Sequence, residues 1–519
     1  MGDIDTERLF IDGNTLSLEA VGRIARQTEV HARLSDVRLS SRAIENVLAS
    51  RAIIEKVLKS GQVVYGVNTG FGSLSSVRID ASQLEALQAN LIRSHAAGTG
   101  DLLDIPTVRA MMLLRANTLA KGLSGVRVEV IETLLAMLKH GVHPCIPSQG
   151  SLGASGDLAP LAHLALVLIG EGEAFYQGQR LSGKAAMDKA GIATITLKAK
   201  EGLALLNGTQ MMSAIGILTL LEAEKLSMLA DLAGAMTIEA VKGSHQPFDD
   251  RIYQARPHQG HGQSAAQIRA FLANSEIAEG HRDCGKVQDA YSLRCIPQVH
   301  GAIRDILSHV RKVLSIEANA ATDNPLVFPN GDIISQGNFH GEPVAVALDQ
   351  LAIGLAELAS ISERRMDKLM NPVFSELPAF LTPSGKAAGL HSGLMIIHYT
   401  AASLVSENKI LAHPASVDSV PTSNDKEDHV SMGAIAARKA AKILTHTRWV
   451  LTAEVFCASH GLSFEKRLKP GQGVLDTLNF IQSFIPPVTG DRVFAKDIET
   501  LSEKLDSQAF EDILTAYRA

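Results

Sequence analysis

Three small residues, Ala154, Ser155 and Gly156, form the stretch of this sequence with the most distinctive chemistry. With little side-chain bulk nearby, the amide nitrogen of Gly156 can approach the carbonyl carbon of Ala154, and ring closure would give an imidazolone. Loss of water from Ser155 would then leave an exocyclic methylidene. The product would be a carbon electrophile, to which a substrate amine could add. The alternative interpretation is an ordinary tight turn, which the bare tripeptide fits equally well.

The residues that follow the triad predict a helix. Asp157 is a good N-cap, Pro160 falls in the first turn, and an apolar stripe follows at Leu161, Leu164, Ala165 and Leu168. The triad would then lie at the positive end of this helix. We expect the backbone N–H groups there to stabilise negative charge on the ring oxygen when a nucleophile adds to the methylidene.

The segment 153–163, which reads GASGDLAPLAH, resembles the signature of the aromatic amino acid ammonia-lyases, whose cofactor is methylidene-imidazolone (MIO). The blocks YGVNTGFG at 65–72 and EDHVSM at 427–432 extend the resemblance over nearly the whole chain. It is strongest to the histidine-specific members, which convert L-histidine to trans-urocanate and ammonia. The resemblance implies MIO formed autocatalytically from residues 154–156, with no external cofactor.

Removal of ammonia also requires a base that takes the β-hydrogen of the substrate. Tyr65 lies among Gly66, Gly70 and Gly72 in a loop flexible enough to act as a lid, and the family's catalytic tyrosine falls in this motif. A phenol is a poor base at neutral pH unless its anion is stabilised. The alternative is a tyrosine that merely packs a glycine-rich turn.

Further site residues are implied by the resemblance, each with a structural alternative. Arg294 would bind the substrate carboxylate through its planar fork, with Gln288 and Tyr291 beside it; the alternative is a surface or interface ion pair. Asn207 is assigned to the neighbourhood of MIO and substrate, where the alternative is a helix cap. Phe339 would line the pocket or serve as a core phenylalanine.

Glu407 matches a family glutamate that faces the amine or the side chain of the substrate. A buried glutamate there could accept the ammonium proton or hydrogen-bond the imidazole, whereas the alternative is a solvated helix carboxylate. The sequence does not separate these roles.

The choice of substrate depends chiefly on Ser94 and His95. Histidine-specific relatives commonly carry this pair, which can hydrogen-bond an imidazole and would be left unpaired against a phenyl ring. The block AHPASVDSVP at 412–421 also resembles the histidine enzymes, whereas His391 and Leu394 replace the usual Asn and Phe. The alternatives within the family are a tyrosine or phenylalanine ammonia-lyase and an aminomutase.

The composition favours a mainly α protein that acts on a small molecule. The 519 residues are 46% hydrophobic and only 4% aromatic, so the core is mostly aliphatic. A net charge of -6 argues against nucleic-acid binding. The four cysteines show no CxxC pair, and the N-terminus carries no secretory signal, so we expect reduced thiols in the cytoplasm. The uncharged stretch 202–221 contains polar residues, so we expect a buried helix there and no association with a membrane.

Two domains are expected, with a boundary near residue 200. Residues 1–200 would form a smaller helical domain that carries the Tyr65 and Ser155 loops. Residues 201–519 would form a bundle of long helices with C-terminal helices, because apolar residues recur every three or four positions at 211–241, 303–313 and 344–361. The resemblance implies a bundle of the fumarase/aspartase type and a homotetramer.

Interpretations from other classes are a non-catalytic helical scaffold and a fumarase-like lyase without MIO, although the latter leaves the triad unexplained. His258 and His261 are close enough in sequence to share a metal ion. Since no second pair of ligands has a recognisable spacing, we expect a solvated loop there and no metal site.

Overall fold

The computed structural model describes residues 8–27, 36–70, 78–282, 285, 287–382 and 389–519. The chain divides into two compact units, each made of three stretches. The first unit comprises residues 1–221, 310–349 and 414–438, and the second comprises 222–309, 350–413 and 439–519. The expected boundary near residue 200 falls inside the first unit.

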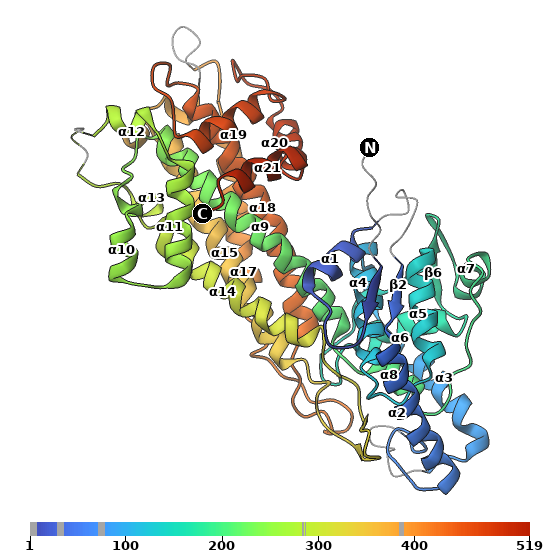
Figure 1. Cartoon of the computed structure of the whole chain (residues 1–519). Helices are drawn as coiled ribbons and strands as arrows, with labels where there is room; N and C mark the ends of the chain where they lie inside the picture. Colours follow the sequence, from blue (N-terminus) through green and yellow to red (C-terminus); the bar gives the residue numbers. More distant parts are fainter. Residues whose placement is uncertain (1–7, 28–35, 71–77, 283–284, 286, 383–388) are drawn as a thin grey trace. The chain divides into compact units, whose positions relative to one another are not determined.

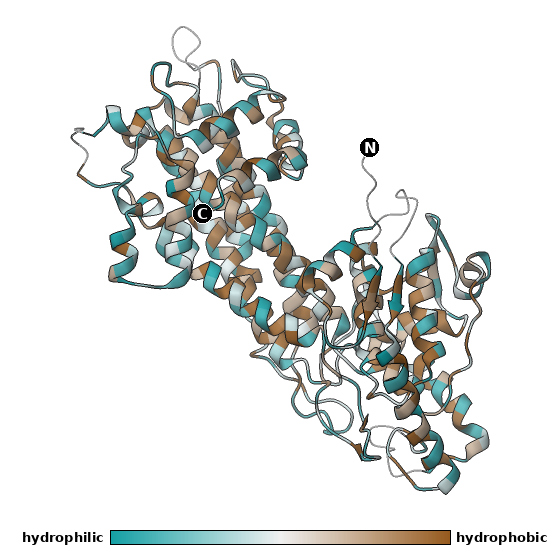
Figure 2. Cartoon of the chain, viewed as in Figure 1, coloured by the Kyte–Doolittle hydropathy of each residue, from teal (hydrophilic) through white to brown (hydrophobic). Residues whose placement is uncertain are grey.

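The first unit carries eight of the helices at the start of the chain (Figure 1): α1 (Leu18–Ala25), α2 (Ser41–Ser60), α3 (Leu84–His95), α4 (Ile105–Ala120), α5 (Val128–His140), α6 (Leu158–Leu168), α7 (Gly183–Lys189) and α8 (Glu201–Leu206). A short 3-10 turn, η2 (Ala81–Gln83), precedes α3. Figure 2 shows many apolar residues along these helices, as expected for elements that pack on one another.

Short strands join the helices of this unit. β1 (Leu9–Ile11) and β2 (Val37–Leu39) pair in parallel, whereas β3 (Thr99–Leu102) pairs antiparallel with β5 (Pro147–Gln149). The strands β4 (His143–Pro144), β6 (Glu173–Tyr176) and β7 (Gln179–Ser182) form an antiparallel sheet, and β8 (Leu326–Val327) pairs with β9 (Ile333–Ile334). Strand β5 leads directly into the loop that holds Ser155.

Helix α4 lies at the centre of the first unit. It begins where the Asp104 side chain accepts a hydrogen bond from the Thr107 amide at 2.9 Å, and every residue from Thr107 to Ala120 is buried. The buried guanidinium of Arg109 donates to the carbonyl oxygens of Ile24 at 3.0 Å and Leu138 at 3.1 Å. These bonds tie α4 to the ends of α1 and α5, because an unpaired charge in this core would be costly.

Four long helices contribute residues to both units: α9 (Gln210–Ala240), α14 (Ile296–Glu317), α15 (Glu342–Met370) and α18 (Gly433–Leu462). They confirm the long helices expected from the spacing of apolar residues and the mainly α fold class. The stretch 202–221 is buried as expected, but α8 and α9 divide it at residues 207–209. Helix α15 is long and apolar enough to cross a membrane, yet 67% of its apolar window is buried, as in the core helix of a bundle.

The shorter helices of the second unit are α10 (Asp250–Ala255), α11 (Gln259–Phe271), α12 (Glu276–Gly280), α13 (Tyr291–Arg294), α16 (Pro372–Ser375), α17 (Met395–Leu411), α19 (Gln472–Gln482), α20 (Phe494–Lys504) and α21 (Gln508–Ala516), with 3-10 turns at η3 (Gln246–Phe248) and η4 (Ala379–Leu381). The buried carboxylate of Glu454 on α18 pairs with Arg365 on α15 at 2.7 Å and accepts from Thr237 on α9 at 2.8 Å. This network fixes the register of three long helices.

Candidate active site

The backbone at Ser155 is held by the loop between α8 and α9. The carbonyl oxygen of Ser155 accepts hydrogen bonds from Asn207 Nδ2 at 3.3 Å and from the Gly208 amide at 3.4 Å. Both donors come from residues 207–208, and not, as the sequence predicts, from the start of the helix at 158–168. Two N–H donors aimed at one carbonyl oxygen form an arrangement that can stabilise negative charge on that oxygen.

Neither Gly156 nor Gly208 has room for a side chain, because Gly156 faces the Gly208 backbone and Gly208 faces buried polar side chains. Gly156 has a φ of +77°, and a Cβ atom there would lie 2.1 Å from the carbonyl oxygen of Gly208. Gly208 has a φ of +135°, and its Cβ would lie 2.6 Å from Arg115 Nη2. The Asp157 amide donates to the Gly208 carbonyl at 2.7 Å, which completes this contact. Only glycine fits both positions.

The carboxylate of Asp157 caps α9 and not α6, which corrects the expected N-cap. Asp157 precedes α6, but its side chain makes no capping bond there. Instead, Oδ2 accepts from the Met211 and Met212 amides at 2.9 and 3.0 Å, and Oδ1 accepts from Ser151 Oγ at 3.0 Å. Complete burial raises the pKa of Asp157 to about 6, although these hydrogen bonds oppose the shift. The Ser155 loop is thus attached to the first turn of α9.

Beside this cap lies the fully buried guanidinium of Arg115 on α4. It donates to the carbonyl oxygen of Ala204 in α8 at 2.9 Å and to the side chain of Gln210. Burial lowers the pKa of Arg115 to about 10, while the charges of Asp323 and Asp157 oppose that shift. Arg115 therefore fixes both ends of the turn that contains Asn207 and Gly208.

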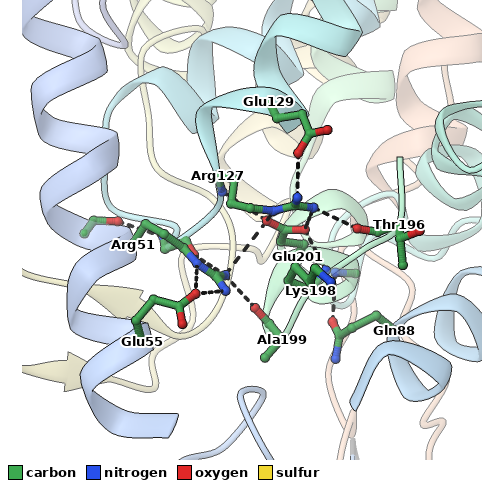
Figure 3. Close-up of polar contacts among 12 residues, drawn as sticks. Arg51, Glu55, Gln88, Arg127, Glu129, Thr196, Lys198, Ala199 and Glu201 are labelled. Carbon is green, nitrogen blue, oxygen red and sulfur yellow. Dashed lines mark hydrogen bonds and ion pairs between the residues drawn. The ribbon is translucent and has the colours of Figure 1, made fainter. Parts of the chain in front are cut away.

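A buried ion-pair network anchors the start of α8 (Figure 3). The carboxylate of Glu201 is fully buried and accepts two hydrogen bonds from the Arg127 guanidinium, each 2.8 Å long. It also accepts from the Lys198 amide at 2.7 Å, and Arg51 donates to the Ala199 carbonyl at 3.0 Å. The hydrogen bonds that Arg127 donates to Glu201 raise the pKa of Arg127. These contacts hold the first residue of α8, the helix that is followed directly by Asn207.

The segment 427–432 runs alongside residues 152–155. The Met432 amide donates to the Leu152 carbonyl at 2.8 Å, and Val430 packs against Ala154 in a small apolar cluster. Ser431 Oγ donates to the carbonyl oxygen of Gly153 at 3.1 Å. A second donor to the same oxygen, also at 3.1 Å, is the Gly341 amide. Two segments far from the triad in sequence thus hold the loop from one side.

Glu427 is the carboxylate that contacts Ser155. The Ser155 hydroxyl donates to Glu427 Oε1 at 2.9 Å, and Thr422 Oγ1 donates to Oε2 at 2.8 Å. Between Thr422 and Glu427 the chain makes a turn in which residues 423–425 all have left-handed φ angles between 52° and 61°. Glu427 lies in the block 427–432 that carries the resemblance, but it is not among the site residues expected from the sequence. Its position in that block was the available signal.

Tyr65, His95 and Phe339 belong to the same unit as Ser155 and are all half-buried. The Tyr65 turn is shaped by Asn68, whose side chain accepts from the Val64 amide at 2.9 Å and donates to the Gln62 carbonyl at 2.8 Å. Gly72, one of the three glycines expected around Tyr65, lies outside the described residues.

His95 ends α3 with a defined tautomer. Its Nδ1 lies 2.8 Å from the Leu91 carbonyl oxygen, which can only accept, so Nδ1 carries the proton. Ser94 Oγ donates to the same carbonyl at 3.0 Å. In the neutral ring, Nε2 of His95 is then an acceptor.

Gln288, Tyr291, Arg294 and Glu407 belong to the second unit. The Arg294 guanidinium lies over the Tyr291 ring, 5.0 Å from its centroid, and the Tyr291 side chain is 71% exposed. Glu407 is exposed on α17, so the burial considered for it is not found within the single chain. The structure does not bring these four residues together with the Ser155 loop inside the first unit.

The two departures from the family pattern also lie in the second unit. The Asp491 amide donates to His391 Nδ1 at 3.2 Å, and Asp491 accepts from the amides of Ser392 and Gly393. Leu394 is fully buried. Both residues therefore shape the turn that precedes α17.

Among the described residues, no group of three or more His, Cys, Asp or Glu side chains is arranged to hold a metal ion. The solvated loop expected at His258 and His261 is wrong: His258 is exposed, but His261 lies in the first turn of α11 and is buried. Cys145, Cys295 and Cys457 are free thiols, and burial raises the pKa of Cys145. Cys284 lies outside the described residues.

The fold and the Ser155 loop together define a class of enzyme: residues 16–483 match the family model of the aromatic amino acid lyases, and the chain belongs to that family. A histidine ammonia-lyase of Caldanaerobacter subterraneus subsp. tengcongensis is 51% identical, and the match covers 98% of each chain. The solved histidine ammonia-lyase of Trypanosoma cruzi is 41% identical with a TM-score of 0.91, covering 99% of this chain and 96% of that one. The tyrosine aminomutase of Streptomyces globisporus is 37% identical with a TM-score of 0.91, covering 98% of each.

Proposed function

We propose that this chain is a histidine ammonia-lyase, which converts L-histidine to trans-urocanate and ammonia. The observation that carries the proposal is the Ser155 carbonyl, held by Asn207 and Gly208 in a loop whose glycine at 156 has no room for a side chain. The 51% identity to a histidine ammonia-lyase supports the choice of substrate.

The cofactor in this proposal is MIO, formed from Ala154, Ser155 and Gly156 with the loss of two waters. The residues fit this group, because the compact backbone at Gly156 excludes a side chain and the oxygen that would become the ring oxygen already has two N–H donors. Once formed, the group supplies a carbon electrophile for the substrate amine. Asn207 and Gly208 then stabilise charge on the Ser155 oxygen.

The remaining residues bind the substrate and move protons. Tyr65 is the proposed base for the β-hydrogen. His95 Nε2, an acceptor by its tautomer, suits an N–H group of the substrate imidazole. Glu427, beside residue 155, is the carboxylate that we assign to the substrate amine or imidazole. Phe339 is the proposed apolar wall of the pocket.

Gln288, Tyr291, Arg294 and Glu407 are proposed to complete the site from neighbouring subunits of a homotetramer. Glu407 lies on a face of α17 on which Ile396, Tyr399 and Ile410 are 58%, 57% and 75% exposed. The spacing of these residues along the helix places them on one stripe, and an exposed apolar stripe is typical of an interface. We place the enzyme in the cytoplasm, and the three free cysteines are compatible with a reducing compartment.

The test is incubation with L-histidine, L-tyrosine and L-phenylalanine, with product identification and intact-mass measurement on wild type and Ser155→Ala. We expect wild type to produce urocanate from histidine and to have an intact mass lower by two waters. The variant should produce no urocanate and show no mass deficit. Coumarate or cinnamate without urocanate would assign a tyrosine or phenylalanine lyase, and β-amino acids would assign an aminomutase. A full-mass, inactive wild type would indicate a non-catalytic scaffold.

A further inference from the structure

The imidazole of His340 binds two backbone groups at once. The Glu342 amide donates to Nδ1 at 3.3 Å, and Nε2 lies 3.1 Å from the carbonyl oxygen of His429. A carbonyl oxygen only accepts, so Nε2 carries a proton, whereas Nδ1 accepts and carries none. The fold therefore fixes His340 as the neutral Nε2–H tautomer.

The two segments that His340 joins are the segments that hold the Ser155 loop. Gly341, the next residue, donates its amide to the Gly153 carbonyl, and Ser431 donates its hydroxyl to the same oxygen. His429 lies between Ser431 and Glu427, whose carboxylate contacts Ser155. The bond from His340 to the His429 carbonyl thus ties the segment at a point between its two contacts with the loop.

The rings of His340 and His429 stack. Their planes differ by 1° and their centroids are 5.8 Å apart, which is an offset parallel arrangement. The stack restricts rotation of the His340 ring, so that Nε2 remains directed at the carbonyl. The stack and the hydrogen bond are separable, because the bond uses only the backbone of His429.

We propose that His340 is a positioning residue for the lyase reaction, whose Nε2–H holds the backbone at His429 and thereby Glu427 against residue 155. Residues 412–432 connect α17 to α18 outside helices and strands, and the backbone bonds of Glu427, at 3.0 and 3.3 Å to Thr422, join it only to its own segment. A bond two residues away removes freedom that the carboxylate would otherwise have. This inference rests on the proposed function.

The experiment compares His340→Ala, His340→Gln and His340→Asn with wild type by steady-state kinetics on L-histidine. A glutamine amide can replace the Nε2–H donor, whereas an asparagine oxygen can replace only the Nδ1 acceptor. We expect His340→Ala to lower kcat by about 10- to 100-fold with KM changed by less than about 3-fold. His340→Gln should recover most of kcat, and His340→Asn should not. The control His429→Ala, which keeps the carbonyl, should reduce kcat less than His340→Ala does.

Intact mass and melting temperature separate the possible outcomes. A loss of kcat with the two-water deficit retained, and with rescue by glutamine, supports positioning. An unchanged kcat in His340→Ala, or loss of the mass deficit, overturns it. If His340→Ala does not fold, the comparison of the other two variants decides. A kcat of His340→Asn equal to or above that of His340→Gln overturns the proposal, and a higher kcat in His340→Gln supports it. If the wild-type enzyme does not act on histidine, the proposed function itself is wrong. This failure is distinguishable from a failure of the positioning role, because it is seen before any variant is made.

Discussion

The buried carboxyl of Asp157 makes a quantitative prediction about the pH dependence of stability. Its pKa of about 6 in the folded chain exceeds the ordinary value of 3.8, because burial disfavours the ionised form. For an acid with a raised folded pKa, the stability penalty is complete above pH 6 and disappears as the pH falls toward 3.8. Asp157→Asn removes this penalty. Its Oδ1 can still accept from the two amides of α9, and its amide group can donate to Ser151.

The size of the effect follows from the two pKa values. Between about pH 4.5 and about pH 7.5 the penalty grows by about 2 kcal/mol. For a chain of 519 residues that unfolds as one unit, this corresponds to about 2 °C in melting temperature. The melting temperature of Asp157→Asn relative to wild type should therefore rise by about 2 °C between the two pH values.

The assay is thermal unfolding across this pH range, with Asp249→Asn as a control whose effect should not change with pH. The hydrogen bonds from Arg251 lower the pKa of Asp249 below its ordinary value of 3.8, so its stabilising effect is present at both pH values and is lost only as the pH falls below 3.8. The control variant should accordingly be less stable than wild type by the same amount at both pH values. A difference between Asp157→Asn and wild type that stays constant or falls as the pH rises would refute the reasoning.

Three further predictions concern the site and its supports. Asn207→Ala removes one donor to the Ser155 oxygen and should lower kcat by about 10²- to 10³-fold, and a loss below about 10-fold in steady-state assays would contradict the charge-stabilising role. Glu427→Gln should lower kcat by about 10²-fold. Glu407→Gln is the matched comparison. A larger loss of kcat in that variant would indicate that Glu407, on α17, is the carboxylate that acts in the reaction. Glu201→Gln leaves the Arg127 fork without its buried partner and should lower the free energy of unfolding by about 3 kcal/mol in a denaturant titration. As a control, Asp188→Asn breaks the exposed ion pair with Lys184 and should lower the free energy of unfolding by no more than about 0.5 kcal/mol.

Local chemistry in the sequence predicted those features that depend on neighbouring residues. The triad, the helix after it and the long amphipathic helices could be recognised because each rests on residues within a few turns. The cap formed by Asp157 could not, since its partners Met211 and Met212 lie more than 50 residues away in sequence. The sequence indicates that Asp157 is an N-cap residue, but it does not indicate that the helix it caps is α9.

The assignment of the carboxylate shows a second limit. Glu407 and Glu427 both lie in blocks that resemble the family, and the sequence does not state which one reaches Ser155 across more than 250 residues. The contact depends on the turn at 423–425 and on the path of the 427–432 segment, neither of which has a helical or strand period. The two compact units were equally hidden, because four continuous helices contribute to both.

The contact between Gly156 and Gly208 limits what mutagenesis can establish about the triad. Under the proposed chemistry Gly156 has two roles: its nitrogen would enter the ring, and the opposite backbone occupies the space that a side chain would need. A larger residue at 156 would disable the enzyme through either cause, and the loss would not reveal which. Ser155, whose hydroxyl faces a carboxylate and not a backbone wall, is the position where replacement probes the chemistry separately from the packing.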